Sequence, residues 1–308
     1  MNKVLIFGAG GFVGPHLVRE MASHGYEVYG SDRSGVKMPE DCVKTYECDI
    51  LDAEMVKSVI YKVQPTHIIN LAAISSVGLS WKLPQQTMEI NVCGAVNILD
   101  AMREITPDAR ILLIGSSEEY MPSADPIGED QPINANNPYG ISKVSLEQFS
   151  SVYHKRYGLQ IYHVRAFNHT GPGQGDNFVI PSWCRQVAEI SRSGKPGVLK
   201  TGNLDIQRDF SDVRDIVRAY RMVIESDDCE EIYNVGSGRS LHLRELVEAI
   251  TALSEQPVSL ETDPKLLRPI ENPVICCDHT HITEKLGWEP EHDILDTIRE
   301  IYLGLVNR

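Results

Sequence analysis

One tyrosine in this 308-residue chain is spaced for acid–base chemistry. Tyr139 is followed four residues later by Lys143, and no other of the twelve tyrosines has a lysine at that spacing. On a helix the two side chains share one face, and an ammonium group beside a phenol lowers the phenol's pKa from its usual value of about 10. A tyrosine tuned in this way can exchange a proton near neutral pH. We predict this role for Tyr139, the alternative being a surface pair that arises by chance.

A second group of polar residues follows an apolar segment. Ser116-Ser117-Glu118-Glu119-Tyr120 comes after the strand-like residues 110–114. A hydroxyl at the carboxyl end of a strand can donate a hydrogen bond to a substrate oxygen in the crevice of an open α/β sheet. We therefore predict that Ser116 works with Tyr139. Without that tyrosine, a polar turn after a strand would be the default interpretation.

Three glycines near the start of the chain are spaced for phosphate binding. Gly8, Gly11 and Gly14 follow the apolar residues 4–7 and lead into a helical pattern. Glycines at this spacing allow a tight turn and let backbone N–H groups and the helix N-terminus approach a pyrophosphate. The segment predicts a dinucleotide cofactor.

Charged residues after the next two strand-like segments bear on which dinucleotide binds. Asp32 can accept hydrogen bonds from an adenosine 2′-hydroxyl and repel a 2′-phosphate, which favours NAD. Arg33 can instead hold a phosphate or stack on adenine, so NADP stays open. Asp49 falls where the adenine edge would lie, or is a turn residue ahead of a helix capped by Asp52. Solvated turn residues are the alternative for Asp32 and Arg33 as well.

The elements that position these residues alternate along the first half of the chain. Strand-like segments at 4–7, 27–29, 45–47, 67–70, 110–114 and 160–164 are interspersed with helical patterns at 12–24, 53–62, 84–104 and 138–157. This alternation predicts an α/β fold class, a Rossmann-like doubly wound parallel sheet covered on both faces. A glycine-rich loop at 168–175 and helical patterns at 181–193, 213–225, 243–254 and 293–305 predict a smaller C-terminal substrate-binding lobe.

The same patterns suggest domain boundaries. We expect residues 1–165 to form the dinucleotide-binding domain, and residues 211–238 to return to it through the strand-like segment 231–235. Residues 166–210 and 239–308 then form the substrate lobe.

Composition narrows the partners and the compartment. With 29 Lys and Arg against 43 Asp and Glu, the net charge is −14, which argues against nucleic acid as a partner. Hydrophobic residues at 42% and charged residues at 23% are globular values. Seven cysteines without a C-x-x-C pair, and the lack of a long apolar run, predict a cytoplasmic protein with no membrane segment. Cys276-Cys277 and His279-x-His281 lack matching ligands, so we expect no metal.

The motifs together resemble the extended short-chain dehydrogenase/reductase family. The likeness is carried in family order by Gly8-x-x-Gly11-x-x-Gly14, Leu71-Ala72-Ala73, Asn91, Ser116 and Tyr139-x-x-x-Lys143. It implies NAD(P) chemistry on a nucleotide-sugar, with Ser116, Tyr139 and Lys143 as the catalytic triad, and a homodimer formed through segments 84–104 and 138–157. We assign the remaining cofactor contacts to Phe12, Val13, Ile50, Leu71, Ala72 and Ala73.

The second half of the chain is similar to the GDP-sugar branch of that family. Residues 165–174 and 201–215 look most like GDP-6-deoxy-4-keto-mannose reductases, which make GDP-rhamnose. The resemblance implies a pyrophosphate bound by Asn168, Arg208 and Arg268, a guanosine bordered by Phe178, Val179, Gly202 and Asn203, and a hexose facing Ser75. Guanidinium groups suit phosphate, although each arginine would serve equally well in a structural ion pair.

The reaction implied is reduction of the C4 ketone of GDP-4-keto-6-deoxy-D-mannose to GDP-D-rhamnose by NAD(P)H. Tyr139 would protonate the C4 oxygen, Ser116 would hydrogen-bond it, and Lys143 would hold the nicotinamide ribose.

Glu118 keeps an alternative open. In the sister GDP-mannose 4,6-dehydratases a carboxylate two residues after the catalytic hydroxyl is the base at C5, which is the place of Glu118. Against a dehydratase or epimerase with bound NAD(P) stand Ser116, where those enzymes usually carry Thr, and residues 170–174, which read T-G-P-G-Q rather than E-S-P-R-R. Met121 departs from the glycine usual in both groups. A silent dinucleotide-binding sensor is a remote alternative, because such a protein would be expected to lose one of the triad residues, and all three are present.

Overall fold

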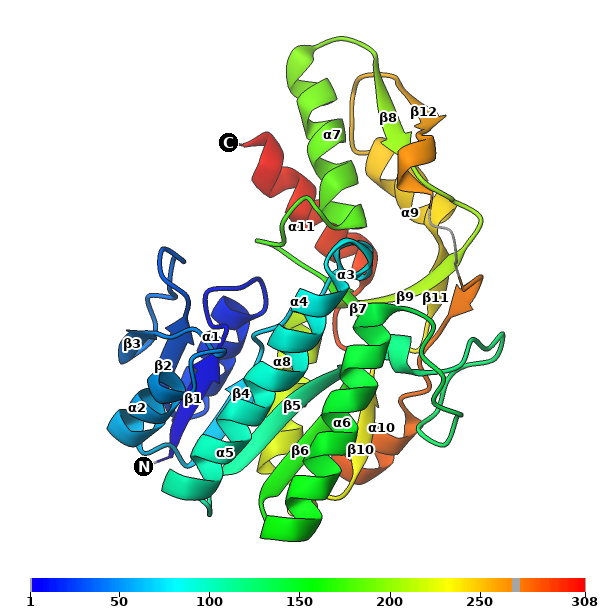
Figure 1. Cartoon of the computed structure of the whole chain (residues 1–308). Helices are drawn as coiled ribbons and strands as arrows, with labels where there is room; N and C mark the ends of the chain where they lie inside the picture. The colour runs from blue at the N-terminus through cyan, green and yellow to red at the C-terminus, as the bar shows by residue number, and fades with distance from the viewer. Residues whose placement is uncertain (1, 268–271, 308) are drawn as a thin grey trace.

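A seven-stranded, wholly parallel sheet forms the centre of the computed structural model, which describes residues 2–267 and 272–307 (Figure 1). The strand order is β10–β6–β5–β4–β1–β2–β3. The bounds are β1 Lys3–Phe7, β2 Glu27–Asp32, β3 Lys44–Glu47, β4 His67–Asn70, β5 Arg110–Ser116, β6 Gln160–Ala166 and β10 Ile232–Val235. The predicted Rossmann-like, doubly wound sheet is confirmed, with its topological switch point between β1 and β4.

Helices cover both faces of the sheet. Successive residues of a strand point to opposite sides, so each buried strand contributes apolar side chains to both faces. Along β1, Val4 and Ile6 join one hydrophobic cluster, and Leu5 and Phe7 join the other. The first cluster packs against α1 (Gly14–Ser23) and α8 (Val213–Glu225). The second packs against α2 (Ala53–Val63), α5 (Ala95–Ile105) and α6 (Pro138–Tyr157).

The segment predicted as one helix over 84–104 is instead divided. It comprises α4 (Pro84–Met88), a π-helix η1 (Glu89–Gly94) and α5. Asn91, in the π-helix, is buried and hydrogen-bonds both backbone groups of Ile74, at 2.8 and 3.0 Å, and the Ser142 hydroxyl at 2.9 Å. The single-helix prediction was therefore wrong. Apolar periodicity indicates which side of a helix is buried, but it does not show that Asn91 hydrogen-bonds to Ile74 and Ser142 from a π-helical turn.

Short elements also differ from expectation. Helix α1 begins at Gly14, so Phe12 and Val13 lie in the loop before it. Asn168–Thr170 forms a strand, β7, where a loop was predicted. The helices α3 (Val77–Lys82) and α10 (Thr280–Leu286) and the 3₁₀ turns η2 (Ser117–Glu119) and η3 (Pro264–Leu266) were not predicted.

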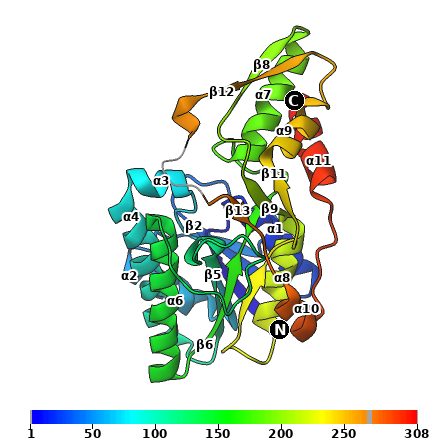
Figure 2. The same cartoon turned by 90° about the vertical axis from the view of Figure 1, so that its right-hand side faces the viewer.

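The C-terminal lobe stands at one end of the sheet (Figure 2). Its core, centred on Trp183, Leu246 and Ile298, joins α7 (Val179–Ser193), α9 (Leu243–Thr251) and α11 (Ile294–Val306). The strand pair β8 (Gly197–Thr201) and β12 (Val258–Thr262) flanks these helices. A small sheet of β11 (Ser240–His242), β9 (Gln207–Asp212) and β13 (Val274–Ile275), with β7 paired to β9, completes the fold.

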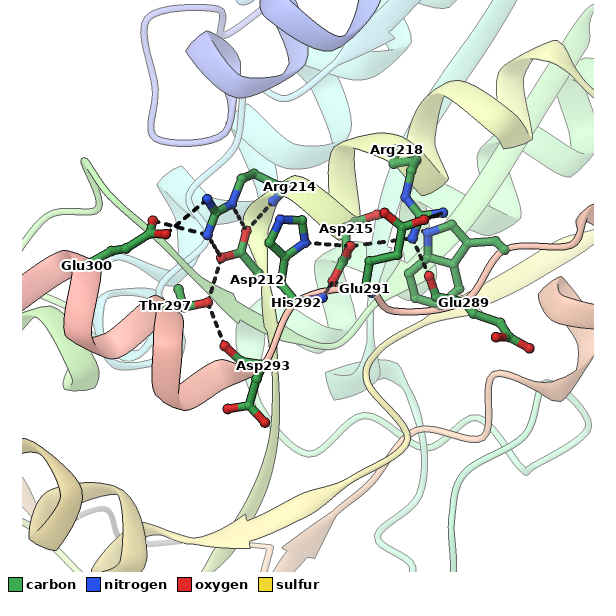
Figure 3. A network of polar contacts seen from close by, with 11 residues as sticks. Asp212, Arg214, Asp215, Arg218, Glu289, Glu291, His292, Asp293, Thr297 and Glu300 are labelled. Carbon is green, nitrogen blue, oxygen red and sulfur yellow. Dashed lines mark hydrogen bonds and ion pairs between the residues drawn. The ribbon is translucent and has the colours of Figure 1, made fainter.

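A polar network fixes the lobe to the helix α8 that covers the main sheet (Figure 3). Asp212 ends β9, is fully buried, and accepts hydrogen bonds from Arg214 at 2.7 Å and from Thr297 of α11 at 2.6 Å. Asp215 accepts from the backbone N–H groups of Glu291 and His292, each at 3.0 Å. Two buried aspartates, where the chain passes from β9 into α8, thus hold α11 and the segment before it.

Within the described residues, no helix is long and apolar enough to cross a membrane. The same part of the chain holds no cluster of three His, Cys, Asp or Glu side chains suited to a metal ion, and its seven cysteines are unpaired.

Candidate active site

Ser116, Tyr139 and Lys143 meet at the carboxyl end of β5. Ser116 is the last residue of that strand, and the other two lie on the first turns of α6. The helix begins at Pro138, as predicted, and its N-cap Asn137 accepts a hydrogen bond from the Gly140 N–H at 2.9 Å. All three side chains are buried, and the Ser116 hydroxyl lies close enough to Tyr139 to lower the pKa of its phenol. The structure therefore brings together the residues that were predicted to act together.

Burial governs the protonation of this trio. It raises the pKa of Tyr139 above the usual 10, nearby Glu119 and Glu118 raise it further, and the Ser116 hydrogen bond lowers it. Burial lowers the pKa of Lys143 to about 8, against the opposing charge of Glu119. The Lys143 ammonium donates to the Ile114 carbonyl at 2.7 Å and lies 5.7 Å from the centre of the Tyr139 ring. The predicted lowering of the Tyr139 pKa is thus wrong for this arrangement, because desolvation by burial is the largest effect on the phenol.

Glu118 lies next to the trio and is held by the helix cap. Its side chain is half-buried, and Oε2 accepts a hydrogen bond from the Asn137 side-chain amide at 2.8 Å. The amide of Asn137 therefore orients Glu118, while its oxygen caps α6. Sequence reasoning missed Asn137, although an Asn directly before a helical Pro is a typical cap.

Glu119 was also missed. It is fully buried, and its Oε1 accepts a hydrogen bond from the Ser116 backbone N–H at 2.6 Å. Ser116 and Glu119 form a capping box around η2. The Ser-x-x-Glu spacing was the available signal.

The glycine loop forms a cradle of the kind a dinucleotide pyrophosphate needs. Gly8 has φ +78°, and a Cβ there would lie 2.7 Å from the Ala72 nitrogen. A Cβ on Gly14 would collide with the backbone of Ala9. Among the described residues no side chain caps the N-terminus of α1, whose N-cap is Val13. Loop backbone and helix N-terminus therefore fit a bound pyrophosphate.

The other predicted cofactor residues lie around this cradle. Asp32 accepts hydrogen bonds from the N–H groups of Gly10 at 3.0 Å and Arg33 at 2.8 Å, which holds its carboxylate beside the loop. Gly11 lies in the loop after β1, and Leu71 and Ala73 lie in the loop after the neighbouring strand β4. The Phe12 ring stacks on His169, with 6.2 Å between the ring centres.

Asp49 and Ile50 take structural roles in the turn before α2. Asp49 is exposed and accepts a hydrogen bond from the Leu51 N–H at 2.9 Å, and Asp52 caps α2. Ile50 is buried in the core against Gly94. The turn interpretation of Asp49 fits this geometry.

The predicted substrate residues lie mostly in the lobe. Asn168 is on β7, opposite Phe210 of β9, and Arg208 is a buried residue of β9. Phe178 and Val179 start α7. Ser75 is exposed in the loop after β4, beside the Ile74 that Asn91 holds.

A cavity of about 520 Å³ opens at the end of β8. Gly202 and Asn203 line it, together with Arg244, Thr262 and Leu267. Of the four residues predicted to border guanosine, Gly202 and Asn203 line this cavity, whereas Phe178 and Val179 do not. Arg268, the predicted second phosphate ligand, is outside the described residues.

Comparison with known proteins agrees with this arrangement. The family model described as GDP-mannose 4,6 dehydratase matches residues 5–301. The chain is 29% identical over 314 residues to GDP-6-deoxy-D-mannose reductase of Pseudomonas aeruginosa, covering 97% of this chain and 96% of that protein. It is 28% identical over 337 residues to human GDP-mannose 4,6 dehydratase, covering 97% and 90%.

Solved structures give the same picture. RMD from Pseudomonas aeruginosa, complexed with NADPH, superposes with a TM-score of 0.87 at 28% identity, covering 100% of this chain and 98% of that one. UDP-glucose 4-epimerase of Thermus thermophilus, complexed with NAD, gives 0.86 at 26% identity, covering 99% of each.

Proposed function

Because the chain belongs to the GDP-mannose 4,6-dehydratase family, and is an NAD(P)-dependent nucleotide-sugar enzyme of the extended short-chain dehydrogenase/reductase type, we propose that it reduces the C4 ketone of a GDP-4-keto-6-deoxy-hexose. The substrate we propose is GDP-4-keto-6-deoxy-D-mannose and the product GDP-D-rhamnose. The observation that carries the proposal is the convergence of Ser116, Tyr139 and Lys143 beside the glycine cradle.

The chemistry divides among three side chains. The reduced dinucleotide, when bound, supplies hydride to C4. Tyr139 gives its phenolic proton to the C4 oxygen as a general acid. Burial raises the pKa of Tyr139, so the phenol carries its proton before the step begins. Ser116 hydrogen-bonds the same oxygen as negative charge develops on it. Lys143 holds the nicotinamide ribose through its ammonium.

We propose NAD as the cofactor, with NADP as the alternative. Asp32, held at the cradle by the Gly10 N–H, is placed to accept from a ribose 2′-hydroxyl. Arg33 beside it is exposed and offers the competing phosphate site. Both cofactors occur in the similar structures, NADPH in RMD and NAD in the epimerase.

For the GDP moiety we propose the lobe residues. Asn168, Arg208 and Arg268 would meet the pyrophosphate. Gly202 and Asn203 of the β8 cavity, with Phe178 and Val179 from the start of α7, would border the guanosine. Ser75 would face the hexose. A chain of charge −14 needs such locally held arginines to bind a dianionic pyrophosphate.

A dehydratase is the second candidate, favoured by one observation. Glu118 is half-buried next to Tyr139, and the Asn137 amide keeps it oriented. A carboxylate held there could take the C5 proton of an oxidised sugar, and the same dinucleotide would stay bound and return its hydride. Human GDP-mannose 4,6 dehydratase is about as similar to this chain as the reductase is.

Absorbance at 340 nm separates the two functions. Purified protein with NADH or NADPH and GDP-4-keto-6-deoxy-mannose should consume reduced cofactor stoichiometrically with the ketone. If the reduced cofactor is stable and GDP-mannose becomes a 4-keto product instead, the chain is a dehydratase. If neither substrate reacts, the assignment to GDP-sugars is wrong.

We further propose that the enzyme is a cytoplasmic homodimer formed through α4–α5 and α6. Exposed apolar side chains line one face of α6 at Ile141, Phe149 and Val152, the last of them 61% exposed. Their spacing places them on a single stripe of the helix. Such a stripe suits a helix-packing interface with a second copy.

A further inference from the structure

Two asparagines, Asn136 and Asn272, join the loop that precedes α6 to a segment that returns from the C-terminal lobe. The Asn136 side-chain amide donates to the Asn272 Oδ1 at 3.2 Å, across 136 residues of the chain. The Asn136 Oδ1 in turn accepts from the Asn137 side-chain amide at 3.2 Å. Asn137 is the residue that caps α6 and holds Glu118. We call Asn272, Asn136 and Asn137, which are hydrogen-bonded in series, the amide relay.

The direction of the hydrogen bonds in the amide relay follows from its end at α6. The Gly140 backbone N–H can only donate, so the Asn137 Oδ1 that it meets at 2.9 Å must accept. The NH₂ group of Asn137 is then the donor, to Glu118 at 2.8 Å and to Asn136 at 3.2 Å. Because the oxygen of Asn136 is used in this bond, its own NH₂ group is left to donate to Asn272. The orientation of each side chain therefore depends on the next one.

At its other end the amide relay begins beside a strand that carries a proposed phosphate ligand. The residues after Asn272 form β13, which pairs with β9 and reaches Arg208 in register. The same segment is fixed to the loop between η2 and α6, because Ile127 uses both its backbone groups to bond residues 276 and 278, at 2.9 and 3.0 Å. The segment 272–278 thus contacts both the substrate lobe and the loop that leads into α6.

An apolar cluster supports this contact. Tyr120 and Ile127 from the loop are buried together with Ile275 and Cys277 from the returning segment and with Phe167 from the end of β6. Apolar packing is non-directional, so it holds the two segments together without orienting a polar side chain. The directional hydrogen bonds of the amide relay supply that orientation at the cap of α6.

We propose that Asn136 and Asn272 are positioning residues that link the proposed GDP site of the lobe to the reacting centre through the cap of α6. The inference rests on the proposed function, because it concerns how the GDP part of the substrate contributes to the step at C4. Contacts to a remote part of a substrate can serve to orient the reacting groups, and they then raise kcat. Here the path runs from β9 through β13 and the amide relay to Glu118 and to the first turn of α6, which carries Tyr139.

The test compares single and double substitutions in the turnover of GDP-4-keto-6-deoxy-mannose, or of GDP-mannose if that is the sugar the native protein converts. Asn136→Ala and Asn272→Ala should each lower kcat about tenfold, because the acid is misplaced. The Kd values for GDP and for NADPH should stay within about twofold of native. The double variant should be no slower than the slower single variant, since both changes break one path. Asn272→Asp keeps the accepting oxygen and should restore most of the kcat that Asn272→Ala loses.

Amide hydrogen exchange gives a second readout that needs no turnover. The Gly140 N–H, bonded to the Asn137 oxygen, should exchange about fivefold faster in both alanine variants, the effect expected from weakening one hydrogen bond. Mass spectrometry of the peptide 137–146 measures it. Asn134→Ala is the matched control, because Asn134 lies in the same loop with an exposed side chain outside the amide relay. It should match the native protein in both assays.

The outcomes are distinct. Losses of kcat that multiply in the double variant overturn the inference, as does a native kcat in Asn272→Ala. A loss of GDP affinity at unchanged kcat also overturns it and assigns Asn272 to the binding of GDP. Should Asn136→Ala not fold, Asn272→Ala decides, with Asn272→Asp as its rescue. If the native protein converts neither GDP-sugar, the proposed function fails, and equal Gly140 exchange in Asn272→Ala and the native protein then overturns this inference as well.

Discussion

Tyr139 and Lys143 are both buried at the end of β5, and burial favours the neutral form of each. A phenol that keeps its proton suits reduction of a ketone, whose oxygen must be protonated as hydride arrives. Burial lowers the pKa of Lys143 to about 8. Because this value is close to neutral pH, a small change in the surroundings of the ammonium changes the fraction that is charged. The spacing of Tyr139 and Lys143 predicted the pair, but only the fold shows how completely both side chains are shielded from solvent.

The substitution Glu118→Gln tests the role of the neighbouring carboxylate. A reductase needs no base at C5, so ketone reduction should keep its native kcat within about threefold. A dehydratase should lose roughly 10²-fold or more, as expected on removing a general base. Turnover of GDP-4-keto-6-deoxy-mannose and of GDP-mannose, measured side by side, provides the check. A large loss of ketone reduction would contradict the reductase mechanism.

The meeting of residues was predictable where a motif encodes it in spacing. Ser116, Tyr139 and Lys143 were expected to meet because strand ends and helical i, i+4 pairs are visible in a sequence. Glu119 was missed although its spacing from Ser116, Ser-x-x-Glu, is that of a capping box; the spacing does not tell that Glu119 is fully buried while Glu118 stays half-exposed. For Asp49 the sequence left two roles open, a cofactor ligand or a turn residue; its side chain accepts a hydrogen bond within the turn, and the cofactor contact stays a prediction.

At the scale of elements, α6 must approach β5 and η2 closely to bring Tyr139 to Ser116. Gly140, next to Tyr139, faces the Glu118 carbonyl, with which a Cβ would collide. The parallel strands were predictable because they are buried, apolar and short. The π-helix η1 was not, because the hydrogen bonds that Asn91 makes from it, to Ile74 and Ser142, join segments far apart in the chain.

We predict that Gly140→Ala pushes α6 away from η2. The cost is about 1–3 kcal/mol of unfolding free energy, and kcat should fall about tenfold or more because the acid is misplaced. Gly304→Ala is the matched control, since Gly304 lies on the last helix with nothing near its Cβ position. That change should add roughly 0.5–1 kcal/mol. Chemical denaturation and steady-state kinetics measure both; a neutral Gly140→Ala would refute the close approach.

Two histidines in the strands give the fold an acid limit. Burial lowers the pKa of His67 on β4 and of His163 on β6 from 6.5 to about 4. Because the folded pKa is depressed, the stability is complete above pH 6.5 and is lost as pH falls toward 4. Each histidine contributes up to roughly 3 kcal/mol to this loss.

The variant His163→Gln should therefore flatten the dependence of melting temperature on pH between 6.5 and 4. The exposed His242 serves as the control, and His242→Gln should keep the native slope. Thermal melts across that range measure the effect. An unchanged slope in His163→Gln would show that another group sets the acid limit.

At the scale of the whole molecule, the proposed reaction requires the two lobes to hold the cofactor and the sugar in a fixed position relative to each other. The buried Asp212, bonded to Arg214 and Thr297, and Asp215, bonded to the chain before α11, tie the lobe to α8 (Figure 3). The sequence predicted a separate lobe because the alternation of strand-like and helical segments stops after Arg165 and a glycine-rich stretch follows. It could not reveal this junction, since Thr297 and His292, which bond to Asp212 and Asp215 from the lobe, lie about eighty residues later in the chain.

The homodimer is testable at the apolar stripe of α6. Phe149→Asp places a charge in that stripe and should yield a species of 34.4 kDa in place of one twice that mass. Tyr61→Asp, on the exposed side of α2, is the control and should leave the dimer intact. Light scattering after size exclusion distinguishes them. A dimeric Phe149→Asp would exclude this face as the interface.

Transfer of labelled hydride tests the central claim most directly. With NADH or NADPH deuterated at the transferable C4 position, GDP-4-keto-6-deoxy-mannose should give a GDP-deoxyhexose with one deuterium at C4 of the sugar and one equivalent of oxidised cofactor. Tyr139→Phe should suppress the transfer. A sugar product without deuterium, formed while the added cofactor stays reduced, would contradict the account and assign the chain to internal hydride recycling.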